Sequence, residues 1–492
     1  MSTTEKNRFS QLLEQLILMS EVKNTSLAKA LQYDASYISK WINGRILPTE
    51  KTKRKVLTGI SHELVRQSTR TGMENLCANY QVIEPEELET VIYDHLEAEY
   101  DYVTELQKTY GSSIAPKTNF FIELSPAEYI ARMHHPVLRR VKLLDVMAEM
   151  DLLSLLHEYR LQIIQGDMRR EAYRAYPDVH FSLVLDLCPE KTDPVYDPVF
   201  LLNMMSDMSR VDFHLYKGKQ AAGRMIFSVK DEFMISGMLM DANRCMSVTT
   251  STEPSNCNVM YYNIRDLCTR ENLLYRETTM KQMITENNYT HSVLSLNQKW
   301  ILGHMTEHFL SDELFEELLG QLGKQQNFHM DETRIRYLHA LTKKALEETR
   351  FDILIYSAAF SNFAIDSELD FFDHKMHLNV QQRESYIKNL LQLCTERKNL
   401  RIKVIYGKLT SDFHYHVTQC VFLSDRISYV RLNTENQDNN LVVLNHPDMQ
   451  MIFTRFFSGL WDEKEASVLS DPEEINSFIC NMIQRLNVIS GI

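Results

Sequence analysis

Two histidines late in the sequence have a spacing that could support chemistry. His414 and His416 alternate on an expected strand, so their side chains would share one face. Paired imidazoles could bind a metal ion or titrate near neutral pH. A metal site would need a third ligand at a recognisable spacing, and none stands there. We therefore expect a hydrogen-bonded surface pair and no metal.

Motifs that cradle phosphate or present an activated serine are absent from the sequence. It contains no GxGxxG, P-loop or GxSxG motif, and only 14 of its 492 residues are glycine. Loops that wrap a phosphate need glycine, because their backbone must approach the ligand closely. We therefore expect no cofactor.

Small polar residues near the N-terminus could read DNA. Residues 35–43 are expected to form a helix whose Ile38, Trp41 and Ile42 face inward. Such a helix can lay its first turns against base edges in the major groove, while flanking basic residues hold phosphates. The residues expected to face DNA are Ala35, Ser36, Tyr37, Ser39 and Lys40 on the helix, and Asn43, Arg45 and Lys51 beside it.

Three further helices would position that segment. Residues 8–19 carry an apolar face at helical spacing, and residues 26–31 form a short second helix capped by Thr25 or Ser26. Asp34 would cap the third helix, and Gly44 would end it in a left-handed conformation. Pro48 would begin a fourth, basic helix.

The run Leu27-Ala28-(x2)-Leu31-(x6)-Ile38-Ser39-Lys40-Trp41-(x2)-Gly44-Arg45-(x2)-Pro48 resembles the phage-repressor/Cro type of helix-turn-helix, an XRE-like pattern. The resemblance covers residues 7–61. The family usually has Gly where Gln32 stands and an acid where Ile42 stands. It implies a transcriptional regulator that binds double-stranded DNA through the third helix.

The charge distribution agrees with a DNA-binding head. The net charge is −13, yet residues 1–60 hold ten Lys or Arg against five Asp or Glu, which gives +5 and leaves −18 for the remainder. An acidic body repels phosphate, so we expect DNA contact to be confined to the head.

Composition indicates a globular chain. Hydrophobic content is 44%, no apolar run approaches the ~18 residues of a membrane span, and the polar start argues against a signal peptide. Eight cysteines without a CxxC pair fit reduced thiols. We expect a cytoplasmic protein without a membrane partner.

A repeat of strand and helix patterns extends beyond residue 175. Buried strands are expected at 181–185 and 351–355, second strands at 211–219 and 402–408, and hairpins around Asp231 and Asp425. Aromatic helices follow at 261–274 and 449–461. We predict two related α/β lobes; the alternative is that α/β chains share such texture by chance.

The second lobe in particular resembles the phospholipase D-type fold, through Val404-Ile-Tyr-Gly407, the Asp425 hairpin and the aromatic segment 453–461. That family's chemistry requires a His-x-Lys pair ahead of an Asp in each lobe, one His attacking phosphorus and the other protonating the leaving group. The second lobe has His416 and Thr418, and the first has Ala222 and Arg224. The pair is incomplete in both, so we expect a degenerate fold without catalytic residues.

The sequence therefore predicts a multidomain protein: an all-α helix-turn-helix domain at 1–65, a helical linker at 66–175, a first α/β lobe at 176–290, a helical connector at 291–349 and a second α/β lobe at 350–492. We expect a DNA-binding transcriptional regulator, homodimeric, whose body senses an unknown small-molecule or protein effector. Two alternatives stay open: a phospholipase D-like phosphodiesterase or nuclease delivered by the head, and a protein-interaction scaffold.

Overall fold

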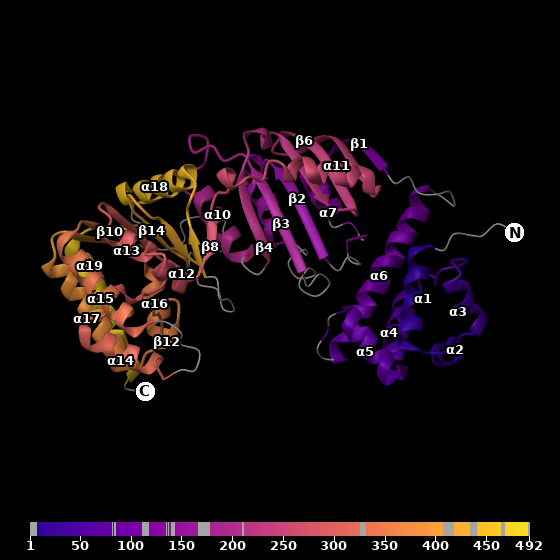
Figure 1. The fold of residues 1–492 in the computed structure, drawn as a ribbon, viewed down its shortest axis with the longest axis horizontal. Helices are drawn as coiled ribbons and strands as arrows, with labels where there is room; N and C mark the ends of the chain where they lie inside the picture. Colours follow the sequence, from indigo (N-terminus) through magenta and orange to yellow (C-terminus); the bar gives the residue numbers. More distant parts are fainter. Residues whose placement is uncertain are drawn as a thin grey trace. The chain divides into compact units, whose positions relative to one another are not determined.

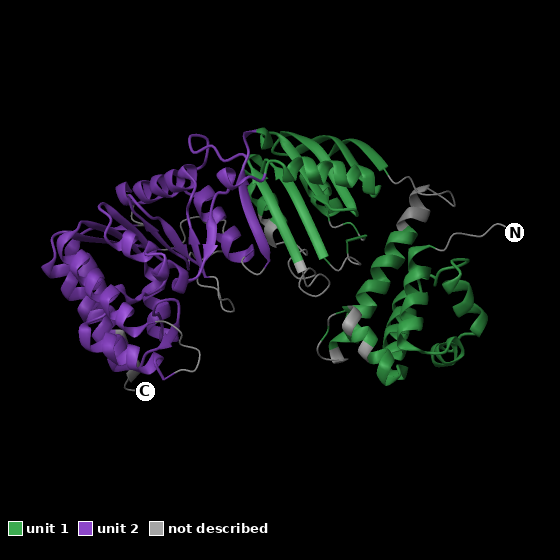
Figure 2. Ribbon diagram, in the orientation of Figure 1, with its two compact units in different colours: residues 1–185, 220–267 green, residues 186–219, 268–492 purple. Residues whose placement is uncertain are grey.

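A computed structural model of the chain describes residues 7–80, 82, 85–110, 118–133, 135, 137–138, 143–165, 178–208, 211–324, 331–406, 418–432, 440–463 and 468–490. The chain divides into two compact units, Met1–Leu185 with Gln220–Leu267 and Asp186–Lys219 with Cys268–Ile492 (Figure 2). Each unit contains helices and a mixed β-sheet (Figure 1). The predicted multidomain organisation, with an α/β body and helical parts, is confirmed.

We call the described part of residues 7–110 the head. Its regular secondary structure consists of six helices and the connections between them. The helices are α1 (Arg8–Ser20), α2 (Asn24–Leu31), α3 (Ala35–Ile42), α4 (Lys53–Gln67), α5 (Arg70–Tyr80) and α6 (Pro85–Tyr110). The second helix begins earlier than predicted, after Lys23, and receives no side-chain cap. The fourth begins later, because Thr49 and Thr52 form a hydrogen-bonded turn before it.

The head has one apolar core, and the predicted linker contributes to it. Phe9, Leu13 and Leu57 share a buried cluster with side chains of α5 and α6. The contributing residues beyond position 65 are Leu76, Leu88, Ile92, Leu96, Tyr100 and Val103. The head therefore extends past the predicted boundary at residue 65, because α1 and α4 need α5 and α6 to cover their apolar faces.

The sheet of the first unit begins well before the predicted first lobe. Its strands are β1 (Thr118–Leu124), β2 (Leu143–Met150), β3 (Asp178–Leu185), β5 (Arg224–Val229), β6 (Phe233–Asp241) and β7 (Arg244–Ser251). Strands β1 and β2 lie within residues 66–175, so the predicted helical linker also contains two strands of this sheet. Its helices are α7 (Pro126–Met133), α8 (His157–Gln165) and α11 (Pro254–Arg265).

The second unit contains a larger sheet. Its strands are β8 (Arg276–Thr278), β9 (Gln298–Leu302), β10 (Phe351–Tyr356), β13 (Leu400–Ile405), β14 (Cys420–Leu423), β15 (Tyr429–Arg431), β16 (Leu441–Val443) and β17 (Val468–Leu469). Strands β11 (Glu368–Asp370) and β12 (Lys375–His377) form a separate hairpin, and β4 (Asp212–Lys217) also belongs to this unit. Since β9 lies within residues 291–349, the predicted helical connector there is wrong in this segment.

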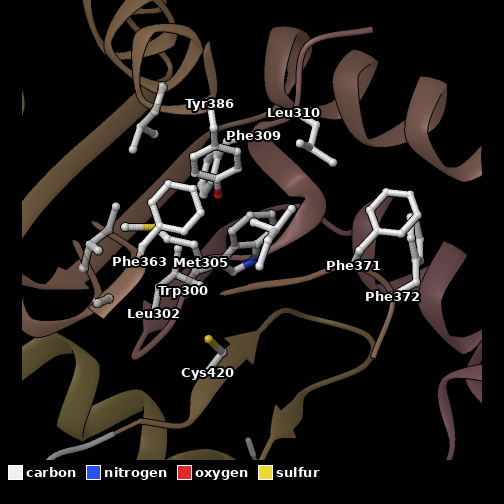
Figure 3. Packing of buried hydrophobic residues seen from close by; sticks show 14 of the residues in the cluster. Trp300, Leu302, Met305, Phe309, Leu310, Phe363, Phe371, Phe372, Tyr386 and Cys420 are labelled. Carbon is white, nitrogen blue, oxygen red and sulfur yellow. The ribbon is translucent and has the colours of Figure 1, made fainter. Parts of the chain in front are cut away.

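Helices cover the sheet of the second unit on both sides (Figure 1). They are α10 (Tyr196–Met208), α12 (Met280–Thr285), α13 (Asn288–Val293), α14 (Asp312–Leu322), α15 (Glu332–Glu348), α16 (Ser357–Asp366), α17 (Val380–Glu396), α18 (Pro447–Asp462) and α19 (Pro472–Ser490). Helix α18 packs against β9 and β14, whereas α14, α15, α17 and α19 contribute to the buried cluster around Trp300. Figure 3 shows Trp300 near Phe309, Tyr386 and Cys420 in this core.

The two sheets share one topology over six strands. Their orders are β1-β7-β6-β5-β2-β3 in the first unit and β8-β16-β15-β14-β9-β10 in the second, where β13 and β17 follow. In both, the last two strands of the six pair in parallel and all other neighbours are antiparallel. The hairpins predicted around Asp231 and Asp425 are present as β5–β6 and β14–β15.

Candidate functional site

A tight three-residue connection sets α3 against α2. Gln32 adopts the left-handed conformation, with φ 59° and ψ 36°, and its N–H donates to the carbonyls of Ala28 and Lys29. Asp34 then caps α3 by accepting a hydrogen bond of 2.8 Å from the Ser36 N–H. The Ser36 side chain and, after it, this backbone hydrogen bond hold the pKa of Asp34 below its ordinary value. The carboxylate thus stays charged at the positive end of the helix dipole.

One face of α3 is fixed in the head's core. Ile38, Trp41 and Ile42 are buried, as predicted. The Trp41 ring packs against Tyr33, with ring centroids 5.2 Å apart, and Tyr33 also contacts Tyr37 at 5.7 Å. These contacts leave α3 little freedom to rotate about its axis, so the opposite face has a defined orientation.

That opposite face is open to solvent. All eight residues expected to contact DNA are exposed: Ala35, Ser36, Tyr37, Ser39, Lys40, Asn43, Arg45 and Lys51. Tyr37 is 43% exposed, and the Lys40 ammonium lies 5.3 Å from the centre of its ring. The Asn43 amide is engaged within the helix, donating to the Ser39 carbonyl at 2.8 Å. Ser36, Tyr37 and Lys40 therefore present hydroxyl and ammonium groups from a rigid helix.

The segment after α3 is held by the head. Gly44 has φ 72°, as predicted for a left-handed cap, and the Arg45 N–H donates to the Lys40 carbonyl. Farther along, the Tyr100 hydroxyl donates to the Pro48 carbonyl at 2.7 Å. These bonds position the exposed side chains of Arg45 and Lys51 beside α3.

Helix α6 changes the charge argument made from the sequence. Lys53 forms ion pairs with Glu97 at 3.0 Å and Asp101 at 2.7 Å, so this lysine of α4 is held by the head itself. Residues 61–110 contain eleven acids against three bases, which turns the +5 of residues 1–60 into −3 over residues 1–110. The boundary between basic and acidic regions thus lies inside the head, between α3 and α6.

A buried charge cluster in the second unit escaped sequence reasoning. The Arg431 guanidinium donates to both Glu307 oxygens, at 2.7 and 2.8 Å, and to Asp370 at 3.1 Å. Arg431 and Glu307 are almost fully buried. The Tyr289 hydroxyl also donates to Glu307, at 2.8 Å. Burial opposes ionisation of Glu307, but the charge of Arg431 outweighs it and keeps the pKa of that carboxyl below its ordinary value.

His304 extends this cluster. Its Nδ1 lies 2.6 Å from the Thr418 carbonyl and its Nε2 lies 3.3 Å from Asp370, so both ring nitrogens face acceptors. Burial lowers the pKa of His304, but the Cys420 sulfur and the Asp370 carboxylate outweigh it and raise that pKa well above its ordinary value. The imidazolium and Arg431 then balance the charges of Glu307 and Asp370. These charges pair with one another, although the buried Arg431 Nε has no hydrogen-bond partner among the described residues.

Among the positions considered for metal or phosphodiester chemistry, Ala222, Arg224 and Thr418 belong to the described residues. His414 and His416 lie outside the described residues. Arg224 lies 3.2 Å from Glu149, and Thr418 uses its carbonyl to accept from His304. Within the described ranges, no group of three or more His, Cys, Asp or Glu side chains could hold a metal ion.

None of the helices described here is both long and apolar enough to cross a bilayer. No model of a known protein family matches the chain. No curated protein matches it significantly either.

Proposed function

We propose that the chain is a sequence-specific regulator of transcription that binds double-stranded DNA through its head. In this proposal α2, the connection at 32–34 and α3 act as a helix-turn-helix of the phage-repressor type, with α3 in the major groove. The observation that carries the proposal is the division of α3 into a buried face and an exposed polar face. A helix fixed on one side and furnished with hydrogen-bonding groups on the other suits the reading of base edges.

The exposed residues have separate roles in this proposal. Ser36, Tyr37 and Lys40 lie in the first turns and middle of α3, where a recognition helix meets bases. Arg45 and Lys51 follow α3 and would hold phosphates. The acidic helix α6 would repel the DNA backbone, and this repulsion restricts binding to the face formed by α3 and its flanks.

The body would join two heads into one regulator. Dimeric helix-turn-helix proteins place two recognition helices about 34 Å apart on a two-fold operator. An effector bound to the body would alter DNA affinity by changing the spacing of the heads. Phosphodiester hydrolysis has no support in the described residues, and the proposed regulator is not an enzyme.

The test is selection of bound sequences from a random duplex library, followed by a salt titration on the enriched site. We expect an enriched site whose affinity falls steeply with salt. Lys40→Ala should cost about 1–3 kcal/mol at particular base pairs, whereas Arg45→Ala should weaken all sequences and flatten the salt slope. Lys344→Ala, an exposed lysine on α15, removes the same charge and should leave binding unchanged. Failure to enrich any sequence with a folded head would refute the proposal and favour a protein-binding scaffold.

A further inference from the structure

The ring of Tyr37, the third residue of α3, is held in one orientation by two other rings. Its centroid lies 5.7 Å from that of Tyr33 and 6.5 Å from that of Trp41. Trp41 belongs to the buried core of the head, and Tyr33 packs against the same core. Tilted and edge-to-face contacts of this kind are favourable between aromatic rings. Tyr37 therefore presents a fixed apolar surface, although 43% of the residue is exposed.

The same ring places a positive charge beside itself. Lys40 follows Tyr37 by three residues, so the two side chains are neighbours on the helix surface. The Lys40 ammonium lies 5.3 Å from the centre of the Tyr37 ring, whose electron-rich face attracts a cation. Among the described residues no carboxylate forms an ion pair with Lys40, whereas Lys53 of α4 is held by two acids. The hydrogen-bond donors of the Lys40 ammonium thus remain available to a ligand.

A fixed aromatic ring favours one base over the others. The 5-methyl of thymine is the apolar group that base pairs display in the major groove. The other groups displayed there donate or accept hydrogen bonds, and against an apolar ring they would lose water without gaining a partner. The ring of Tyr37 is therefore complementary to thymine.

An ammonium group favours a different base. It has three donors and no acceptor, so it suits an edge that carries acceptors alone. Guanine displays two adjacent acceptors, O6 and N7, in the major groove. Adenine displays a donor beside its N7, and cytosine displays a donor. The ammonium of Lys40 is therefore complementary to guanine.

We propose that each DNA half-site contains a thymine whose 5-methyl packs on the Tyr37 ring and a guanine whose O6 and N7 accept from Lys40. The guanine lies within two base pairs of the thymine, because ring and ammonium are 5.3 Å apart and successive base pairs about 3.4 Å apart. This inference rests on the proposed function and specifies the bases that α3 reads. The methyl contact makes binding sensitive to methylation of the pyrimidine at carbon 5.

The first test changes the DNA and leaves the protein intact. Duplexes carrying the enriched sequence are prepared with each thymine replaced, one at a time, by uracil, which lacks only the methyl. At one position per half-site we expect the wild-type dissociation constant to rise roughly fourfold, which corresponds to the loss of one buried methyl. At that position a duplex with 5-methylcytosine should bind roughly fourfold more tightly than one with cytosine. Equal affinity for thymine and uracil at every position would overturn the proposal.

The guanine contact has its own substitution. 7-Deazaguanine lacks the N7 acceptor and keeps O6. Replacing the guanine near the methyl-sensitive thymine should weaken wild-type binding roughly tenfold, because a hydrogen bond to a charged donor is lost. Lys40→Ala should bind the two duplexes equally. The absence of a sensitive guanine within two base pairs of that thymine would contradict the assignment of Lys40.

Variants of Tyr37 assign the methyl effect to the ring. Tyr37→Ala should bind the thymine and uracil duplexes equally, whereas Tyr37→Phe, which lacks only the hydroxyl, should keep the fourfold difference. Loss of that difference in Tyr37→Phe would assign it to the hydroxyl and overturn the packing of the methyl on the ring. Tyr337→Ala is the matched control, because Tyr337 of α15 is 52% exposed and also lies beside a cation, Arg334. It should retain the wild-type difference.

The failure of this inference is distinguishable from that of the proposed function. A sequence that is enriched from the library and bound equally with uracil and 7-deazaguanine would overturn the base assignment, while DNA binding stands. Failure to enrich any sequence with a folded head would overturn both.

Discussion

Asp373 contributes to the pH dependence of the second unit, and one substitution should remove its contribution. It follows the β11 strand with φ 65°, and its N–H donates to the Asp370 carboxylate at 2.7 Å. Burial and the neighbouring charge of Asp370 raise the pKa of Asp373 to about 7. An asparagine side chain would keep the shape and tolerate the left-handed backbone, because Asn is among the residues that adopt it most readily. The perturbation is therefore Asp373→Asn.

The direction in which the free energy of unfolding changes with pH follows from the number of protons that the folded and unfolded chains bind. Between pH 4 and 7 the folded chain holds the Asp373 proton while the unfolded chain, with a pKa near the ordinary 3.8, has lost it. Stability is therefore fully present below pH 4 and falls as the pH rises to 7. A shift of about three pKa units corresponds to about 4 kcal/mol. Because the loop can relax when the carboxylate forms, we expect wild type to lose about 2–4 kcal/mol across this window.

The assay is urea unfolding of the second unit at half-unit steps from pH 4.5 to 8. The chain has three tryptophans, so Trp41→Phe in the head leaves Trp300 and Trp461, both in the second unit, as fluorescent reporters. Asp373→Asn should reduce the loss of stability between pH 4.5 and 6.5, while Asp366→Asn, an exposed aspartate at the end of α16, should not. A slope from Glu277, whose pKa burial also raises to about 7, should remain in both variants.

His304 contributes in a separate window. Because its pKa is raised, its stabilisation is present below the ordinary value of 6.5 and is lost as the pH rises through the folded value. A residual loss above pH 6.5 is therefore expected in the Asp373→Asn variant. A variant that keeps the full slope between pH 4.5 and 6.5 would refute the assignment to Asp373.

Two further predictions concern stability. Arg431→Met should destabilise the second unit by about 3–5 kcal/mol, because it leaves the buried Glu307 carboxylate without its partner; urea unfolding measures this, and a cost below about 1 kcal/mol would contradict it. Gln32→Gly should stabilise the head by about 1 kcal/mol, because glycine adopts the left-handed conformation without strain while Gln32→Ala does not. Hydrogen exchange of peptides from α1–α3 should be slower than in wild type for Gln32→Gly. Gln32→Ala should show no such increase in protection.

The head is the part most readily predicted from sequence. Its helices have strong apolar periodicity, and Asp34 and Gly44 are local signals that need no tertiary context. The left-handed conformation of Gln32 is not predicted by these signals, although the resemblance draws attention to that position. Gln32 has φ 59° and ψ 36°, a left-handed conformation that glycine adopts without strain, which explains why glycine is usual there in the family that the sequence resembles. The acidic pairing of Lys53 with α6 depends on packing between distant segments, so no local pattern reveals it.

The body shows where sequence reasoning fails. Fully buried strands such as β10 have continuous apolar runs, and the sequence predicts them correctly. Strand β2, Leu-Leu-Asp-Val-Met-Ala-Glu-Met, is rich in residues that favour helices, and only its pairing with β3 and β5 makes it a strand. The charge cluster draws on Glu307, Asp370 and Arg431, which are up to 124 residues apart in the chain. Nothing in their local sequence marks them as partners.

The shared topology also shows how the two sheets differ at equivalent positions. The hairpin strands end alike: Val229, two residues before Asp231, pairs with Val146, and Leu423, two residues before Asp425, pairs with Lys299.

Five residues farther along the central strands, these registers lead to Asp151 in the first unit and His304 in the second. Asp151 accepts a hydrogen bond from the Gly223 N–H, whereas the His304 ring faces the Thr418 carbonyl. In both units the side chain contacts the backbone of the segment before the hairpin, at Gly223 in the first unit and at Thr418 in the second. One position thus has the same mechanical role with opposite charge, and the reversal is possible because Asp370 lies beside His304 to balance it. The two sheets therefore keep one topology although an acceptor, Asp151, stands in one and a donor, His304, in the other. A body without catalytic residues, as proposed here, can tolerate this exchange, because its packing does not depend on which group donates the proton.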